Sequence, residues 1–436
     1  MTAAARVIRG RVLSFTDDPA ESGSRAYSLI ENGAVLVNGD LIEAVGDAPD
    51  ILARAPPGAL VDDQTGCLIT PGLIDAHVHY SQTQVIGSYG AQLLDWLQNY
   101  TFVEEQRFAD PAHCARVADF FLDELVRSGT TTAMVYCTVH PASVEAFFAA
   151  AEARAMRMIA GKVMMDRDAP AALTDTAQRG YDESKALIER WQGRSRLDYA
   201  ITPRFAVTST EAQLDAAGSL AREFPHCYVQ THANENKGEI ARVAALFPDA
   251  RSYLDVYAQA GLTGPRSVFG HCIHLQDREV AILSESRSVA AFCPTSNLFL
   301  GSGLFDQARL QRAGVRVALA TDVGGGTSYS MLHTAAEGYK VLQLNGQSWP
   351  ALEAFYRMTL GNARSLSLDD RIGSIEPGKE ADLIALDPRA TPALAHRMEA
   401  AGDDLEVELF ALLMLGDDRA VRQTYVAGEP RKERGV

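Results

Sequence analysis

Two histidines separated by a single residue, His77 and His79, stand at the end of an apolar run with the character of a β-strand. Alternate residues of a strand project to the same face, so both imidazoles would point at one spot. Two convergent imidazoles are half of a metal site, which needs further ligands from elsewhere in the chain. On their own, the two histidines could equally be ordinary polar residues at a strand end that bind no metal.

The rest of the chain supplies the missing ligands. His232, His271 and Asp322 each follow a later apolar run, and Glu235 lies three residues after His232. Imidazoles together with a carboxylate suit Zn²⁺, and Fe²⁺ is possible because imidazole also binds iron. Such a metal acidifies a bound water molecule and so produces a nucleophile at neutral pH. The pattern therefore predicts a catalytic metal site.

Proton transfer would fall to the residues around the metal. Asp322 could bind the metal and also accept a proton from the water, while the carboxyl of Glu235 could carry a proton to the substrate. His271 could be a metal ligand or could hydrogen-bond the nucleophile, and its position in the sequence does not decide between the two roles.

The order of elements explains how residues so far apart in the sequence would meet. Runs with strand character alternate with helix-like segments such as Ala142–Arg157 and Thr210–Phe224. This alternation is typical of parallel βαβ units, and eight of them indicate an α/β fold of the closed (β/α)8 barrel type. The predicted strands are Leu73–His79, Thr130–Thr138, Met158–Asp166, Leu197–Ala206, Cys227–His232, Ser267–Cys272, Val289–Pro294 and Val315–Asp322.

An open doubly wound sheet is the alternative fold, but it usually carries a glycine-rich turn after its first strand, and this chain shows none. In a parallel barrel, side chains at the carboxyl ends of the strands converge over the mouth. The candidate ligands end the first, fifth, sixth and eighth predicted strands, so a barrel would gather them into one cluster.

Both ends of the chain differ from the middle and contain β-like runs. We expect residues 1–70 and 371–436 to form one small β-sandwich domain, with the catalytic barrel, residues 71–370, inserted into it. The pair Asn38-Gly39 is a strong signal for a two-residue hairpin in this domain. The β-like runs are Arg6–Phe15, Ala34–Val45, Glu380–Leu386 and Val421–Val426.

One connection is long for a loop between a barrel strand and its helix. The segment Ile86–Arg107 carries Leu93, Leu94, Trp96 and Leu97. It could form a helical lid over the barrel mouth, or it could be a packing insertion or a subunit contact.

Composition narrows the class of partner. A net charge of -16 disfavours non-specific binding to nucleic acid or to an anionic membrane. No apolar stretch approaches the length of a membrane span. The six cysteines are scattered without a Cys-x-x-Cys pair, which favours reduced thiols in a cytoplasmic protein. We therefore expect a cytoplasmic protein that acts on a small molecule.

Several motifs carry a resemblance that spans nearly the whole chain. They are Pro71-Gly-Leu-Ile-Asp-Ala-His-Val-His, Ser81-Gln82, Leu94-Asp-Trp-Leu-Gln-Asn-Tyr-Thr-Phe102, Ser128-Gly-Thr-Thr-Thr, Thr202-Pro-Arg-Phe205, His232-Ala-Asn-Glu-Asn236, Gly270-His-Cys, Cys293-Pro-Thr-Ser-Asn297 and Thr321-Asp-Val-Gly-Gly-Gly-Thr-Ser-Tyr-Ser-Met-Leu332. With these motifs the chain resembles the amidohydrolase superfamily of metal-dependent hydrolases, and within it the guanine deaminases. The metal motifs indicate only the superfamily. The Trp96 segment, the Pro-Arg-Phe run and the Ser-Tyr-Ser-Met-Leu run point to the guanine deaminases.

The resemblance implies a TIM barrel of the metal-dependent hydrolase type and a homodimer. It assigns Zn²⁺ to His77, His79, His232 and Asp322, makes Glu235 the proton shuttle, and places His271 beside the metal-bound water. Dinuclear relatives use a carboxylated lysine at the end of the fourth strand. Because that predicted strand ends here in Arg204-Phe205, we expect one metal per chain.

Recognition of guanine also has a chemical basis. Guanine presents O6 and N7 as adjacent acceptors, which an arginine fork matches in bidentate fashion. Arg204, at a strand end near the predicted mouth, could supply this fork, or it could instead form a structural ion pair. The resemblance agrees with base recognition by Arg204 and Gln82, with Trp96 and Phe205 as apolar or stacking walls.

The predicted function is the zinc-dependent hydrolytic deamination of guanine to xanthine and ammonia, with attack at C2 and protonation of N3 by Glu235. Deamination of 8-oxoguanine, a pterin or a triazine would need the same metal site. A catalytically inactive scaffold is the alternative outside enzymes, but a scaffold has no need of a complete ligand set and a carboxylate shuttle.

Overall fold

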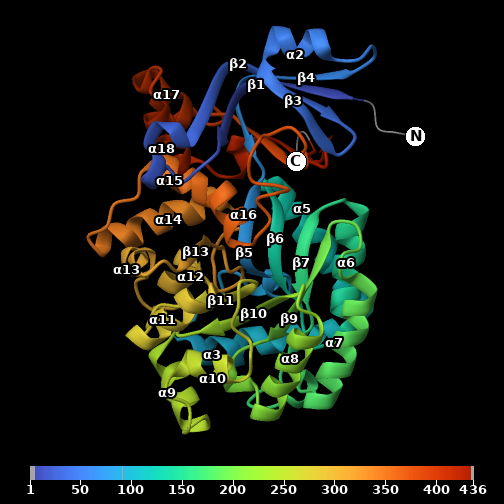
Figure 1. Ribbon diagram of the computed structural model, residues 1–436, viewed down its shortest axis with the longest axis vertical. Coiled ribbons are helices and arrows are strands. Elements are labelled where there is room, and N and C mark those ends of the chain that lie inside the picture. Colours follow the sequence, from blue (N-terminus) through green and yellow to red (C-terminus); the bar gives the residue numbers. More distant parts are fainter. Residues whose placement is uncertain (1–4, 91, 434–436) are drawn as a thin grey trace.

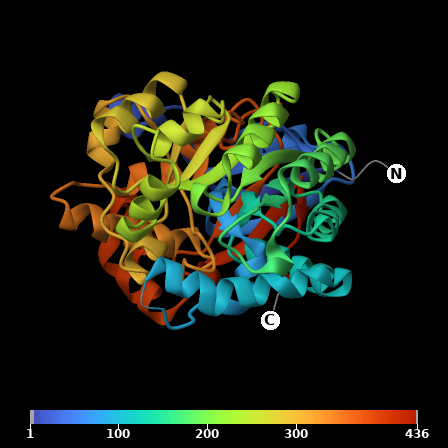
Figure 2. The ribbon, with the colours of Figure 1, turned by 90° about the horizontal axis from the view of Figure 1, so that it is seen from below.

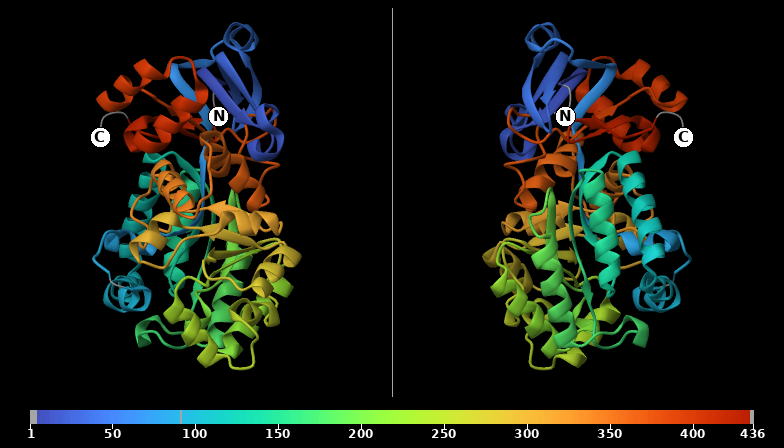
Figure 3. Two further views of the ribbon diagram at one scale, coloured as in Figure 1. Left: turned by 90° about the vertical axis from the view of Figure 1, so that its left-hand side faces the viewer. Right: turned by 90° about the vertical axis from the view of Figure 1, so that its right-hand side faces the viewer.

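The protein consists of a barrel with a smaller β-domain at one end (Figure 1). The structure is a computed structural model that describes residues 5–90 and 92–433. The N-terminal and C-terminal parts of the chain lie together in the small domain, and the middle of the chain forms the barrel (Figure 3). Among the described residues, no helix is both long enough and apolar enough to cross a membrane.

Eight parallel strands form the barrel in the order of the sequence, which confirms the predicted fold. Backbone hydrogen bonds close the ring between its first and last members. The amide of Asp322 donates to the carbonyl of His77 at 2.9 Å, and the amide of His79 donates to the carbonyl of Val323 at 2.8 Å. The strands are β5 (Leu73–His79), β6 (Thr130–Tyr136), β7 (Arg157–Gly161), β9 (Leu197–Pro203), β10 (Tyr228–Ala233), β11 (Ser267–His271), β12 (Val289–Phe292) and β13 (Arg316–Leu319), with the two-residue β8 (Val163–Met164) beside β9.

Helices follow the strands and cover the outside of the barrel (Figure 1). Their ends have ordinary caps: the side chain of Asp110 accepts from the amide of Ala112 at the start of α5, and Thr210 accepts from Gln213 at the start of α8. The helices are α5 (Pro111–Arg127), α6 (Pro141–Ala153), α7 (Ala177–Trp191), α8 (Glu211–Glu223), α9 (Lys237–Leu246), α10 (Tyr253–Gln259), α11 (Asp277–Ser286), α12 (Pro294–Phe299), α13 (Gln307–Arg312) and α14 (Met331–Leu344).

The predicted strands start close to the observed ones, but several extend too far at their carboxyl ends. The last predicted strand reaches Asp322, whereas β13 ends at Leu319. The third is interrupted at Lys162, whose ammonium turns aside to pair with the buried carboxylate of Asp175. At these ends the backbone leaves the sheet so that side chains can turn inwards. His271 and Asp322 adopt positive φ values of 71° and 53°.

The small domain contains strands from both ends of the chain, as the sequence predicted. They form one seven-stranded sheet in the order β16-β15-β14-β4-β1-β2-β3. The predicted hairpin is present, with Gly39 at a φ of 66° between β2 and β3. One apolar cluster collects buried side chains from β1, β2, β3, β4, β14 and β15. The strands are β1 (Arg6–Phe15), β2 (Tyr27–Asn38), β3 (Leu41–Asp47), β4 (Leu60–Pro71), β14 (Leu383–Leu386), β15 (Val421–Val426) and β16 (Glu429–Pro430).

Short helices complete the two ends of the chain. The helices of the C-terminal part were not predicted from the sequence, and one of them, α18, buries Leu409 and Leu412 in the main core. The helices near the two ends of the chain are α1 (Pro19–Ser22), α2 (Ala48–Arg54), α15 (Ala351–Tyr356), α16 (Asn362–Ser365), α17 (Pro392–Ala401) and α18 (Leu405–Leu415). All six cysteines are buried and free, as expected for reduced thiols.

Two arginines join the barrel to the small domain. Arg157, at the start of β7, and Arg196, just before β9, both donate through Nε to Oε2 of Glu380 at 2.9 Å. Arg196 also contacts the carboxylate of Asp382. The Arg157 side chain is only 2% exposed, so its charge depends on this pairing.

We expect Glu380→Ala to lower the free energy of unfolding by about 3–5 kcal/mol, because two largely buried arginines lose a partner. Denaturant unfolding measures this change. Glu152→Ala, which breaks a surface pair with Arg194, is the control and should leave stability nearly unchanged. A Glu380→Ala protein as stable as the Glu152→Ala control would contradict the role of this ion-pair network.

The ion pairs of Glu380 with Arg157 and Arg196 also predict that stability depends on pH. Burial by itself would raise the pKa of Glu380, but the hydrogen bond from Arg157 and the charge of Arg196 outweigh it and lower the pKa. A carboxyl group whose pKa is lowered by folding stabilises the folded state. This stabilisation is fully present above the pKa of the unfolded state and is lost as the pH falls towards the lower pKa of the folded state. The difference between wild type and Glu380→Ala should therefore decrease below about pH 4.3.

Candidate active site

Four of the predicted ligands meet at the carboxyl end of the barrel. One ligand atom from each of His77, His79, His232 and Asp322 lies within 4.8 Å of the other three. Nε2 of His79 is 3.2 Å from Nε2 of His232, and Oδ1 of Asp322 is 3.3 Å from Nε2 of both His77 and His79. The side chains come from β5, β10 and the turn after β13, so only the closed barrel brings them together.

Hydrogen bonding fixes how these histidines can act. Nδ1 of His232 lies 2.8 Å from the carbonyl of Arg204, which can only accept, so this nitrogen carries the proton. Its Nε2 therefore presents a lone pair to His79. Both ring nitrogens of His77 are buried and have no hydrogen-bond partner in the described part of the chain. Lone pairs that face one another in a buried site, with a carboxylate beside them, fit a divalent cation.

The electrostatics agree with this arrangement. Burial lowers the pKa of His79 to about 3, so its imidazole is neutral, as a metal ligand must be. Burial alone would raise the pKa of Asp322, but the imidazoles of His77 and His79, 3.3 Å from its Oδ1, hold that pKa well below its usual range. The backbone of Gly270 packs closely against the His77 ring. A Cβ at position 270 would lie 2.6 Å from that ring, so no larger residue fits there without a shift.

Glu235 and His271 lie together beside the ligand cluster. Oε2 of Glu235 is 3.2 Å from Nε2 of His271, which in turn is 3.7 Å from Oδ2 of Asp322. Burial, reinforced by the charge of Asp322, raises the pKa of Glu235 to about 8. A carboxyl with such a pKa holds a proton at neutral pH and can donate it. Nδ1 of His271 faces Oδ1 of Asn297 at 3.0 Å, so His271 is held in place from behind.

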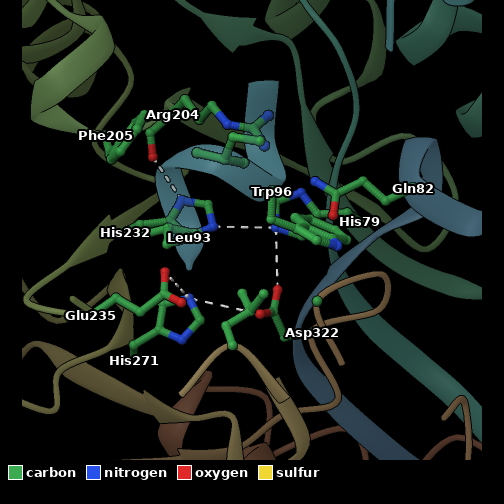
Figure 4. Close-up of a pocket in the computed structure, with 13 residues that line it drawn as sticks. His79, Gln82, Leu93, Trp96, Arg204, Phe205, His232, Glu235, His271 and Asp322 are labelled. Carbon is green, nitrogen blue, oxygen red and sulfur yellow. Dashed lines mark hydrogen bonds and ion pairs between the residues drawn. The ribbon is translucent and has the colours of Figure 1, made fainter. Parts of the chain in front are cut away.

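A cavity opens onto these groups, and all four predicted substrate-binding residues line it. In Figure 4, Arg204 and Phe205 lie on the side of the cavity opposite to Glu235, His271 and Asp322, with His232 between them. Apolar side chains complete the wall. The lining residues are His79, Gln82, Leu93, Trp96, Leu97, Arg204, Phe205, His232, Glu235, His271, Leu300, Asp322 and Gly325.

Arg204 forms the ion pair that was one of the two interpretations left open by the sequence, and it also lines the cavity. Its Nη1 donates to the two carboxylate oxygens of Glu105 at 2.9 and 3.0 Å. Nε2 of Gln82 approaches the same carboxylate at 3.3 Å. Nε and Nη2 of Arg204 have no acceptor among the described residues.

The long connection after β5 is helical and lies at the strand ends. It forms α3 (Leu93–Trp96), a π-helical turn (Leu97–Thr101) and α4 (Phe102–Glu105), and then continues towards α5. Figure 2, a view from the end opposite to the small domain, shows this segment in blue to cyan along one edge of the barrel. Leu93, Trp96 and Leu97 line the cavity, so the segment forms part of its wall. The choice between a lid, a packing insertion and a subunit contact stays a prediction.

Sequence reasoning missed several residues that contact the site. Asn297 belongs to a motif that follows the seventh strand, and its place behind His271 could have been proposed from that position. Ser302, which donates to Oε1 of Glu235 at 3.1 Å, and Glu105 carry no such signal. Tyr136 stacks on His79 with ring centroids 4.4 Å apart, and its hydroxyl has no partner in the described chain.

Comparison with known proteins decides the family. The model of the amidohydrolase family matches residues 68–431, a range that includes every residue of the site. The chain belongs to the amidohydrolase family. Its similarity to guanine deaminases, inferred from motifs, is confirmed as well. The chain is 48% identical to the guanine deaminase of Escherichia coli (strain K12) over 98% of both chains, and 44% identical to a probable guanine deaminase of Deinococcus radiodurans over 92% of this chain and 93% of that one.

Solved structures give the same result. The E. coli guanine deaminase covers 99% of this amidohydrolase with a TM-score of 0.96, and the match covers 100% of that chain. A guanine deaminase from C. acetobutylicum, solved with guanine in its active site, is 26% identical and superposes with a TM-score of 0.88 over 98% of this chain and 99% of that one. The barrel and the terminal β-domain therefore have the arrangement of known guanine deaminases.

The ligand cluster predicts that this amidohydrolase purifies with about one equivalent of divalent metal per chain. Prolonged dialysis against a chelator should lower its melting temperature, and added Zn²⁺ should restore it, because a ligand that binds only the folded state stabilises that state. His232→Ala should abolish stoichiometric binding, as elemental analysis would show. His396→Ala, at an exposed histidine far from the cluster, is the control. Equal metal contents in the two variants would disprove the site.

Proposed function

We propose that this amidohydrolase catalyses the hydrolytic deamination of guanine to xanthine and ammonia. One observation carries the proposal: a single cavity has a set of metal ligands with a proton-bearing carboxyl at one side and the donors of Arg204 at the other. The C. acetobutylicum guanine deaminase with bound guanine, which shares this fold, supports the choice of base.

Base recognition follows from the donors that face the cavity. Arg204 offers N–H groups to the adjacent O6 and N7 acceptors of guanine, and Gln82 adds an amide. Adenine carries an amino group where guanine has O6, so the arginine would meet a donor instead of an acceptor. A buried donor left unpaired in this way rejects the wrong base strongly. Trp96 and Phe205 form apolar walls that exclude water from the bound ring.

The metal would be held by His77, His79, His232 and Asp322. When bound, a Zn²⁺ ion at this position lowers the pKa of a water molecule and so supplies a nucleophile at neutral pH. We assign one Zn²⁺ per chain because the fourth strand ends in Pro203 and is followed by Arg204, which leaves no lysine for a second metal.

The chain's own residues then move the protons. Asp322, assisted by His271, accepts a proton as water attacks C2, while Glu235 donates its proton to N3. The resulting Glu235 carboxylate takes the proton of the new hydroxyl group, and the amino group takes the proton held on Asp322 and leaves as ammonia. Both carboxyl groups return to their starting states, and guanine plus water has become xanthine plus ammonia.

The homodimer, the cytoplasmic location and the division of the chain at residues 70 and 370 stay predictions. Size-exclusion chromatography with light scattering tests the first of these directly.

Glu235→Gln should keep its metal but reduce kcat by about 100- to 10,000-fold, because the amide has no proton to give to N3. Steady-state ammonia release together with elemental analysis measures both quantities. Near-normal turnover by Glu235→Gln would remove Glu235 from the proposed proton path.

The function itself is tested by ammonia release from guanine beside adenine, cytosine and 8-oxoguanine. We expect fast turnover of guanine alone. Adenine replaces O6 with a donor, and 8-oxoguanine carries a proton on N7, so both would oppose the arginine donors. A metal-loaded protein that releases no ammonia from guanine but deaminates another base of this panel would refute the proposal.

A further inference from the structure

The carboxylate of Glu105 stands between the two residues that we expect to recognise the base. Glu105 is the last residue of α4, and its side chain is completely buried. Both of its oxygens accept from Nη1 of Arg204, at 2.9 and 3.0 Å. Oε1 also accepts from Nε2 of Gln82 at 3.3 Å and from Oγ of Ser81 at 3.4 Å. The Glu105 carboxylate thus contacts Ser81 and Gln82, which follow β5, and Arg204, which follows β9.

We propose that Glu105 is a positioning residue that determines specificity, because it fixes the guanidinium of Arg204 and the amide of Gln82 so that their free donors meet the O6 and N7 edge of the base. This inference rests on the proposed function and assigns to Glu105 a task that the metal cluster cannot perform.

Hydrogen-bond directions support this role. The guanidinium is planar, so a bond from Nη1 to both oxygens of a buried carboxylate fixes the orientation of the whole group. Its Nε and Nη2 atoms then remain available to a ligand. The Phe102 ring, 5.5 Å from the guanidinium carbon, restricts the group further. The Gln82 amide is held at both ends, since its Oε1 accepts from the amide of Gly324 at 3.3 Å.

Charge gives a second reason for the pairing. A lone arginine on this cavity would be a buried cation without a partner, which is unfavourable and would attract anions. Guanine is a neutral base that offers acceptors but no full negative charge. Paired with Glu105, Arg204 presents directional donors with no net charge, which suits a neutral ligand better than an anionic one.

The neighbouring residue provides a matched control. Glu104 is also buried and lies in the same helical turn, but its carboxylate points elsewhere and pairs with His113 at 3.1 Å and Arg107 at 2.8 Å. It does not line the cavity. Glu105→Gln and Glu104→Gln therefore make the same chemical change one residue apart, and only the first affects Arg204.

The experiment compares inhibition by hypoxanthine, which keeps O6 and N7, with inhibition by purine, which lacks O6. In Glu105→Gln we expect the Ki of hypoxanthine and the KM of guanine to rise about 10- to 100-fold, the range for losing a charge-assisted hydrogen bond. The Ki of purine should change less than about three-fold, and the metal content should be unchanged. In Glu104→Gln both inhibitors should bind as in wild type. Equal changes for the two inhibitors in Glu105→Gln, or no change for either, would overturn the inference.

A double-mutant cycle tests whether Glu105 acts through Arg204. Once Arg204→Met has removed the fork, adding Glu105→Gln should alter hypoxanthine binding by less than about three-fold. Full additivity of the two substitutions would contradict the proposal. If Glu105→Gln alone does not fold, the pair Glu105→Leu with Arg204→Met replaces both charges by apolar groups, a change that buried ion pairs often tolerate. That double variant should lose its preference for hypoxanthine over purine, and retention of the preference would refute the role.

The outcomes also separate this inference from the proposed function. A wild-type protein that deaminates guanine, with a Glu105→Gln variant that behaves like Glu104→Gln, refutes only the role of Glu105. A metal-loaded wild-type protein that neither deaminates guanine nor distinguishes hypoxanthine from purine refutes both.

Discussion

The site depends on the backbone hydrogen bonds that close the barrel between its first and last strands. The carbonyl of His77 and the amide of His79 pair with the segment Asp322–Val323, so three ligand residues belong to the closure itself. Asp75 strengthens the same junction, since its buried carboxylate accepts from the amide and the hydroxyl of Thr321. The metal ligands cannot converge unless the eighth strand returns to the first. The ligand cluster therefore exists only in the closed barrel.

Positive φ values at His271 and Asp322 show a second consequence of this convergence. Such a conformation typically costs about 1–3 kcal/mol in a residue other than glycine, and it persists only where the surrounding structure enforces it. Here the enforcing contacts are the strand hydrogen bonds and a large apolar core. The backbone strain thus lies at His271 and Asp322, where the chain leaves the sheet and the side chains turn towards the barrel mouth.

Charge in the cavity is divided between two regions. At one side, three histidines and an ionised Asp322 form a candidate set of ligands for a cation, and the neighbouring Glu235 keeps its proton because it is buried beside that negative charge. At the other side, the positive charge of Arg204 and the negative charge of Glu105 cancel in an ion pair. The carbonyl of Arg204 also accepts from Nδ1 of His232, so one residue orients His232 with its backbone and lines the cavity with its side chain. Arg204 is thereby held at a fixed position relative to the ligand cluster.

The sequence by itself determined the class of fold and most of the site. The alternation of strands and helices predicted the barrel, and polar residues after apolar runs predicted the metal ligands, because parallel strands must present their carboxyl ends on one side. The strand Leu73–His79 and the strand Val421–Val426 match the observed β5 and β15 residue for residue. The tertiary structure decided what depends on contacts between distant segments. It ended β13 at Leu319, broke the third strand at Lys162, and showed that Arg204 both lines the cavity and pairs with Glu105. Neither hydrophobic periodicity nor motif spacing contains that pairing. It arises from two segments about a hundred residues apart in the sequence, which meet only in the folded chain.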